Sequence, residues 1–304
     1  MPEFQTSIPD SVGRAPPAPD HRARALLVAA LAAFSFVCMD AVIKLMATRY
    51  GALQLTFFRF AGGGVFALLL WLWQRSEMPD RAAWRLHIVR SVFLLVSLVG
   101  YFHALTVLPL AQAVTISYLA PIFVSVLAVP VLKEQPSRSI WLALAMGLAG
   151  ILISVLPELR ASASVANGSR LLGMASAATA ALSFACVMLL ARRQSRNDSV
   201  WTILLLQTML PVALLAAPAA WEWQPVLHSD LVLILLAGAL GTLGLLSLTH
   251  ALTHLEASRV APLEYSGFVW AAGLGYLLFD EVPTTATAAS AALIIAGCLM
   301  LLRR

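Results

Sequence analysis

Several ionisable and polar side chains stand inside long apolar stretches of this 304-residue chain. A charged group in an apolar surrounding must be paired or hydrated, so such residues tend to face a polar cavity. The chemistry they would support is reversible binding of a small charged or zwitterionic solute. The candidates for this binding site are Asp40, Lys44, Tyr101, His103, Thr115, Tyr118, His250, Glu264, Tyr265 and Trp270.

Each charged candidate also has a structural interpretation. Asp40 and Lys44 are four residues apart, one helical turn, so they either pair with each other or one of them faces the solute. Glu264 stands five residues from Arg259, which leaves an interfacial ion pair open. Arg59 lies about one turn inside the second apolar stretch, where a long side chain can snorkel to the headgroups. We favour snorkelling over solute binding for Arg59.

The uncharged candidates have alternatives too. His103 and His250 occupy equivalent places in a repeat described below, which favours a shared role in holding a helix end over ligand or proton binding. Tyrosines in membrane helices pack between helices as often as they bind ligands. Pro121 frees a backbone carbonyl, and it predicts either a hinge or a static kink.

Motifs for catalysis and cofactors are missing from the sequence. It contains no phosphate-binding loop, dinucleotide fingerprint, zinc-ligand spacing or serine elbow. The three cysteines, Cys38, Cys186 and Cys298, lie in apolar segments without metal-ligand spacing and are predicted to be packing residues. We therefore expect no catalytic residue, no metal and no cofactor, and we do not expect an enzyme.

An internal repeat organises the chain. Residues 103–108 read HALTVL and residues 250–255 read HALTHL, and the same register aligns Tyr118 with Tyr265 and Glu134 with Glu281. A period near half the chain differs from that of a solenoid and is common in transporters. We divide the chain into a disordered tail at residues 1–22, a first repeat at residues 23–160 and a second repeat at residues 161–304.

Composition indicates that lipid is the solvent of both repeats. The chain is 60% hydrophobic and 12% charged, too few polar residues to cover a soluble protein of this length. A membrane helix needs about 20 apolar residues. Segments of that size fall at 24–48, 53–74, 85–107, 110–132, 138–156, 170–192, 199–220, 230–253, 258–279 and 284–302. We predict an all-α integral membrane protein with ten transmembrane helices as two inverted five-helix repeats, because an odd number of crossings reverses the second repeat.

Basic residues predict the orientation, since loops rich in Lys and Arg stay in the cytoplasm. With the N-terminus inside, one side of the membrane holds only Arg49, Arg160 and Arg170. The other side holds Arg14, Arg22, Arg24, Arg75, Arg81, Arg85, Arg90, Lys133, Arg138, Arg192, Arg193, Arg196, Arg259, Arg303 and Arg304. Both termini are therefore expected in the cytoplasm, and the net charge of +5 requires no nucleic-acid partner.

The two copies of the repeat resemble a known family. Residues 103–137, HALTVLPLAQAVTISYLAPIFVSVLAVPVLKEQPS, and residues 250–283, HALTHLEASRVAPLEYSGFVWAAGLGYLLFDEVP, are similar to the repeat of the EamA-type drug/metabolite transporters. The resemblance is strongest to the branch of ten-helix amino-acid exporters. It implies a substrate cavity between the halves, and it makes Glu134 and Glu281 part of the repeat's own pattern, which we interpret as structural acids that fix the next helix.

The expected function combines these observations. We expect a secondary transporter in a bacterial inner membrane that exports amino acids of broad range, aromatic and other neutral ones included, by alternating access. Uptake or efflux of another metabolite, such as a vitamin or nucleoside-like compound, is the alternative, and a membrane-embedded enzyme is less well supported. One monomer in the bilayer holds the whole inferred pathway. Proton coupling and facilitated diffusion both remain open.

Overall fold

The computed structural model describes residues 19–46, 49–107, 116–161, 168–221, 223–279 and 285–302. Within these ranges every regular element is helical. The first half contains α1 (Pro19–Met46), α2 (Ala52–Gln74), α3 (Arg81–Val107), α5 (Ala120–Leu132) and α6 (Arg138–Ala161). The second half contains α7 (Gly168–Gln194), α8 (Val200–Trp221), α9 (Asp230–His254), α10 (Ala257–Val260), the 3-10 helix η1 (Ala261–Tyr265), α11 (Ser266–Phe279) and α12 (Thr285–Leu302).

The helices have the length and surface of membrane-spanning segments. Six described helices are long and apolar enough to cross a bilayer, and three shorter ones are also apolar. Large apolar side chains such as Leu69, Trp73 and Leu277 point outward and are more than half exposed. Lipid offers no hydrogen-bond partners to the backbone, and a helix satisfies its backbone N–H and C=O groups internally. The predicted class of all-α membrane protein is confirmed.

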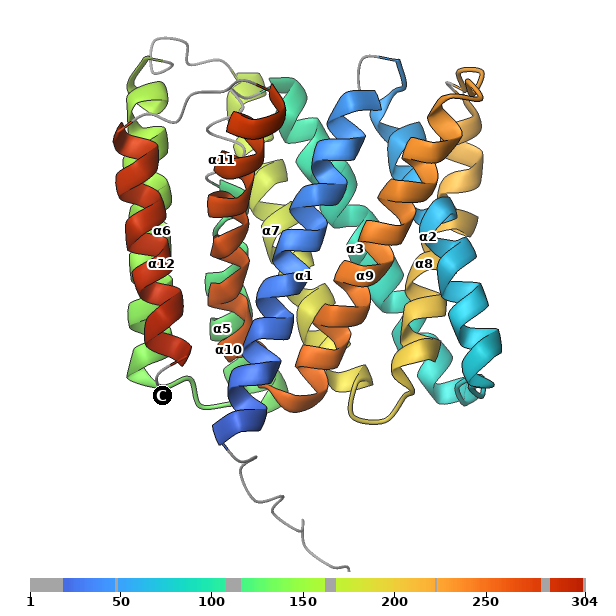
Figure 1. Cartoon of the computed structure of the whole chain (residues 1–304), viewed down its shortest axis with the longest axis horizontal. Helices are drawn as coiled ribbons and strands as arrows, with labels where there is room; N and C mark the ends of the chain where they lie inside the picture. Colours follow the sequence, from blue (N-terminus) through green and yellow to red (C-terminus); the bar gives the residue numbers. More distant parts are fainter. Residues whose placement is uncertain are drawn as a thin grey trace, which may run out of the picture.

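Helix pairing relates the two halves by a pseudo-two-fold axis. Helix α1 packs most extensively against α9, and the equivalent helix of the second half, α7, packs in the same way against α3. Helix α5 lies on α7 as α11 lies on α1, while α2 pairs with α8 and α6 with α12. In Figure 1, α1 runs upward and α7 runs downward, so the repeats are inverted. The first residues of α1 and the last of α12 lie at the same end of the bundle (Figure 1).

Hydrogen bonds at the two ends of the bundle follow the same symmetry. At one end, the Gln54 amide near the start of α2 donates to the Gln224 carbonyl oxygen at 2.7 Å. At the other end, the Thr202 hydroxyl near the start of α8 donates to the Glu77 carbonyl oxygen at 2.8 Å. The start of α2 is thus bonded to the loop before α9, and the start of α8 is bonded to the loop before α3. These are equivalent contacts in the two halves.

The ninth predicted segment is not one continuous helix. Residues 258–279 were expected to form a single span, whereas the structure divides this stretch among α10, η1 and α11. Pro262 lies in the first turn of η1 and lacks the N–H that an α-helical bond would need. The fourth segment is interrupted at the matching place, by a turn at residues 118–119 before α5 begins.

Three glycines let α2 and α9 cross with their backbones in contact. A Cβ at Gly238 would meet the backbone atoms of Gly62 and Gly63. Beside this crossing, the Thr242 hydroxyl donates to the Gly63 carbonyl oxygen at 3.1 Å. Small residues allow such close approach between membrane helices. The crossing fixes α2 against α9 on one side of the central cavity.

Candidate functional site

A cavity of about 430 Å³ lies in the middle of the bundle, within the usual range for small-molecule sites. Helices α1, α3, α5, α7 and α9 surround it together with η1 and α11. Most of the wall is apolar, formed by alanines and side chains such as Phe36, Phe184 and Leu248. The polar lining residues are Asp40, Ser97, Tyr101, Ser117, Tyr118 and Glu264.

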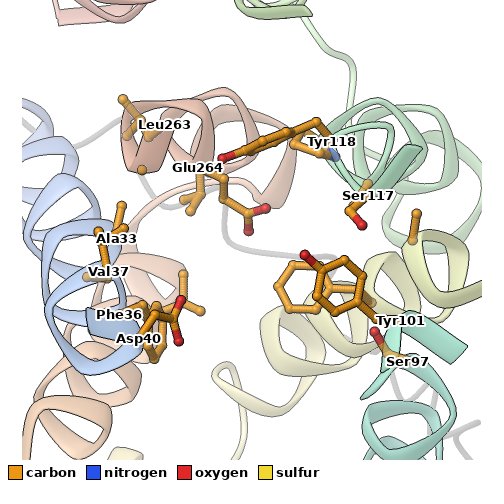
Figure 2. A pocket seen from close by; sticks show the side chains of 18 of the residues that line it. Ala33, Phe36, Val37, Asp40, Ser97, Tyr101, Ser117, Tyr118, Leu263 and Glu264 are labelled. Atoms are coloured by element: carbon orange, nitrogen blue, oxygen red, sulfur yellow. The ribbon is translucent and has the colours of Figure 1, made fainter. Parts of the chain in front are cut away.

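Two carboxylic acids from opposite halves face this space. Figure 2 shows Asp40 of α1 and Glu264 of η1 with their carboxyl groups directed into the cavity. Tyr101 of α3 points its hydroxyl into the same space from the other side (Figure 2). Asp40 lies inside the bundle, yet its side chain is accessible to solvent, because it lines the cavity. The pair of acids makes the cavity a favourable place for a cation.

The interrupted segments bring two tyrosines together. The Tyr265 hydroxyl donates to the Tyr118 carbonyl oxygen at 3.0 Å, and the ring centroids are 5.8 Å apart. Tyr265 is only 1% exposed and packs over Gly147 of α6, where a Cβ would collide with its ring. Tyr118 lines the cavity, whereas Tyr265 is not part of the lining and packs against Tyr118. Pro121 also lines the cavity, in the first turn of α5.

Other predicted site residues lie away from the cavity lining. His103 makes a 2.9 Å hydrogen bond with the Ser176 hydroxyl, and His250 packs beside His254 with ring centroids 4.7 Å apart. Trp270 is 41% exposed and meets Phe34 edge to face at 5.1 Å. The Lys44 side chain and residues Thr115 and Glu281 lie outside the described part of the chain.

Glu134 has contacts of a different kind. Its carboxylate accepts hydrogen bonds from the Ala257 and Ser258 backbone N–H groups at 3.0 and 3.1 Å and from the Ser258 hydroxyl at 2.9 Å. Arg192 lies 3.8 Å from the same carboxylate. These bonds cap the start of α10. The acid of the first repeat therefore holds a helix of the second repeat, in addition to preceding α6 in the chain.

A second cavity of about 240 Å³ adjoins the first and contains two arginines, Arg59 and Arg90. The Arg59 guanidinium lies over the rings of Phe36 and Phe60, at 5.8 and 5.3 Å from their centroids. The expectation that Arg59 snorkels to the headgroups is therefore wrong, because aromatic faces hold it inside the bundle. We call this space, lined by Arg59, Arg90 and Gln207 among others, the side cavity.

Sequence reasoning missed Arg90, which was counted among the residues of the cytoplasmic face. Arg90 is 3% exposed, and its Nη1 donates to the Gln194 side-chain oxygen at 2.7 Å. It follows the first residue of α3 by nine positions, about 13 Å along the helix axis. In the predicted segment 85–107, by contrast, Arg90 follows the first residue by only five positions, a depth from which a long basic side chain can reach the surface.

Comparisons with known proteins agree with this architecture. The model of the EamA-like transporter family matches residues 23–156 and 171–303. The chain is similar to the pseudopaline exporter of Pseudomonas aeruginosa, with 32% identity over 91% of this chain and 95% of that protein. It is 25% identical to an S-adenosylmethionine uptake transporter of Rickettsia bellii, over 86% and 88% of the two chains. A crystal structure with 21% sequence identity superposes with a TM-score of 0.75 over 91% of this chain and 96% of the other, which supports the fold.

Proposed function

The chain belongs to the EamA-like transporter family, and we propose that it exports amino acids or related zwitterions across a bacterial inner membrane. Transport is secondary in this proposal, because the sequence has no motif for ATP hydrolysis. The solute moves through the cavity between the two inverted halves, which expose it first to one side and then to the other.

The observation that carries the proposal is the presence of two acids, Asp40 and Glu264, in the lining of a mostly apolar cavity. A carboxylate in such a surrounding binds an ammonium group by a charge-assisted hydrogen bond. The tyrosine hydroxyls of the lining, Tyr101 and Tyr118, add neutral donors and acceptors. The apolar walls then accept side chains of different size, because one methylene is worth only about 1–3 kcal/mol in such a pocket. This combination suits the neutral amino acids as a group.

Direction is supported by the relative at 32% identity, which is an exporter. The sequence itself resembles the branch of amino-acid exporters. These exporters and the pseudopaline exporter carry different solutes, but both transport outward. The relatives at about 25% identity take up S-adenosylmethionine, and they support the second candidate, uptake of another small metabolite through the same cavity.

Counterflow in proteoliposomes tests the proposal. Vesicles holding purified protein are loaded with unlabelled methionine, threonine or phenylalanine, and trace labelled amino acid is added outside. We expect transient accumulation of label that protein-free vesicles do not show. The Asp40→Asn and Glu264→Gln variants should each lose most of it. Folded protein that exchanges no amino acid would refute the amino-acid proposal and leave the metabolite alternative.

A further inference from the structure

The side cavity and the main cavity share part of their walls. Phe36, Asp40, Phe184 and Leu248 line both spaces, so a solute bound beside Asp40 in the main cavity also lies next to the entrance of the side cavity. Helices α2 and α8 contribute to the side cavity and not to the lining of the main one. The two spaces therefore form one site with two chemically different ends.

Two buried groups in the side cavity lack hydrogen-bond partners within the described part of the chain. Arg90 uses its Nη1 on Gln194, but its Nε has no partner. Gln207 is 8% exposed, and its side-chain oxygen also has no partner. Leaving a buried polar group unsatisfied costs about 1–3 kcal/mol, and more for a charged group. A ligand carboxylate supplies the acceptor that Arg90 Nε lacks and recovers that part of the cost, whereas the Gln207 oxygen needs a donor, such as water or an N–H group of the ligand.

Arg59 completes a cationic end of the site. Asp40 lines both cavities and therefore lies at the boundary between this cationic end and the main cavity. The Arg59 guanidinium rests against aromatic rings, which favour a cation without using up its hydrogen-bond donors. Guanidinium groups bind carboxylates with two parallel hydrogen bonds. Within the described residues, the side cavity thus offers two guanidinium groups and one unpaired donor, Arg90 Nε, whereas Glu264 lines only the main cavity and Asp40 lines both.

We propose that the solute is an elongated zwitterion whose carboxylate binds to Arg59 and Arg90 in the side cavity while its amine lies beside Asp40 and Glu264. This inference rests on the proposed transport function and ranks the members of its substrate class: amino-acid derivatives with a carboxylate several bonds from the amine are preferred. A simple α-amino acid has both charges on one carbon atom, contacts only one end of the site and should bind more weakly.

A series of straight-chain ω-amino acids from glycine to 8-aminooctanoate measures the separation of the two ends. Each compound is paired with the alkylamine of the same length, and binding to the purified protein is measured by the rise in its thermal unfolding midpoint. We expect the longer ω-amino acids to bind about tenfold more tightly than their matched amines, the gain from one charge-assisted contact. Glycine should bind no more tightly than ethylamine.

Variants identify the residues responsible. Arg59→Gln should reduce the ratio of the two affinities to near one, and Arg59→Lys should retain part of it. Arg90→Gln should act like Arg59→Gln, and if its lost bond to Gln194 prevents folding, the Arg59 pair of variants suffices. Arg85→Gln removes a charge from an exposed position of the same helix and should leave the ratio unchanged.

Two results would overturn the inference. One is an affinity ratio between ω-amino acid and matched amine that is the same in the native protein and in Arg59→Gln. The other is that no ω-amino acid, at any length, binds more tightly than its matched amine. The second result combined with methionine counterflow would leave the transport proposal intact and show that Arg59 serves only as a structural partner of Asp40. Failure of counterflow combined with a length-dependent ratio would instead remove simple amino acids as substrates and keep the elongated class.

Discussion

Two glutamates show how surroundings decide the role of one residue type. Glu134 is 4% exposed and accepts three hydrogen bonds from α10, beside Arg192. Glu264 faces the main cavity and has no ion-pair partner within the described residues. A carboxylate taken out of water is costly unless it is paired or hydrated. Glu264 therefore depends on cavity water or on a bound cation, whereas Glu134 is already satisfied.

Replacing Glu264 by Gln should impair transport and leave the fold intact. The amide has nearly the same shape but no charge, so a bound ammonium loses one ionic partner, worth about tenfold in affinity. Stability should be unchanged or slightly higher, because a carboxylate without an ion pair is removed. Concentration-dependent counterflow and the unfolding midpoint measure the two effects. Glu256→Gln, outside the cavity lining, is the matched control, and equal transport loss in both variants would contradict this role.

Tyr265 should behave as a structural residue. Its ring is buried against Gly147 and Tyr118, and its hydroxyl satisfies the Tyr118 carbonyl. Tyr265→Ala should cost about 3–5 kcal/mol of stability, as for other buried aromatic residues, and lower the yield of folded protein. Tyr265→Phe should cost only about 1 kcal/mol. Thermal unfolding in detergent ranks the two variants. A stable Tyr265→Ala protein would show that the contact is dispensable.

Sequence reasoning identified the acids of the cavity because charge inside lipid has few possible locations. For Asp40 and Glu264 the sequence left ion pairs with Lys44 and Arg259 as alternatives, and in the structure both acids line the main cavity. The same argument was not applied to Arg59 and Arg90, because long basic side chains can reach the membrane surface from some depth. Their actual direction depends on aromatic rings of other helices, which a single sequence does not place.

At the scale of elements, the crossing of α2 and α9 should be intolerant of any side chain at Gly238. An added Cβ would meet backbone atoms of Gly62 and Gly63, which cannot rotate away. Gly238→Ala should destabilise the protein by about 1–3 kcal/mol, the usual cost of overpacking. Gly273→Ala in α11, where nothing lies within 4 Å of the added atom, should be neutral or stabilising. Unfolding midpoints that fall equally in both variants would contradict the close crossing.

The cap on α10 should also contribute measurable stability. Glu134→Ala leaves two backbone N–H groups and the Ser258 hydroxyl without their acceptor and separates Arg192 from its acid. Breaking a buried pair by removing one partner costs about 3–5 kcal/mol. The exposed pair of Glu256 and Arg259 gives the comparison, since Glu256→Ala should cost under about 1 kcal/mol. Thermal unfolding of both variants checks this difference.

The limits of helix prediction are visible at the ninth segment. Apolar length correctly predicted a span near residues 258–279, but it does not distinguish an α-helix from α and 3-10 pieces in series. The break coincides with Pro262, which lacks a backbone N–H. In the same 3-10 helix, Glu264 faces the main cavity and Tyr265 donates to the Tyr118 carbonyl oxygen. Irregular backbone at membrane depth is tolerated where it lines a cavity.

At the scale of the whole molecule, the repeat is symmetric in fold and asymmetric in charge. The register that aligns Tyr118 with Tyr265 places Ser117 opposite Glu264, and both line the main cavity. Allowing one inserted residue, Arg59 corresponds to Gln207, and both line the side cavity. The family match confirms the expectation of a transporter rather than an enzyme. In the proposed mechanism, symmetry allows the halves to exchange conformations, and we propose that the unequal charges give the solute one preferred orientation.

Orientation in the membrane is the last consequence of the whole-molecule arrangement. The loop at residues 75–80 lies at the end of the bundle that holds the described chain ends, and residues 223–229 lie at the opposite end (Figure 1). The first end has Arg75, Arg81 and Arg138, while the second has Arg49, which is paired with Asp230 at 2.8 Å. Basic residues are retained in the cytoplasm, so the first end should face inward.

Single cysteines in a background without Cys38, Cys186 and Cys298 test this orientation. Met78 and Leu227 are exposed and lie at the two ends, so their substitution by cysteine should not disturb packing. Leu227→Cys should react with a membrane-impermeant maleimide in intact cells, and Met78→Cys should react only after the inner membrane is permeabilised. The reverse pattern would place the termini outside. Export would then require the solute to enter from the end that carries Arg49, so the proposed direction of transport depends on this result.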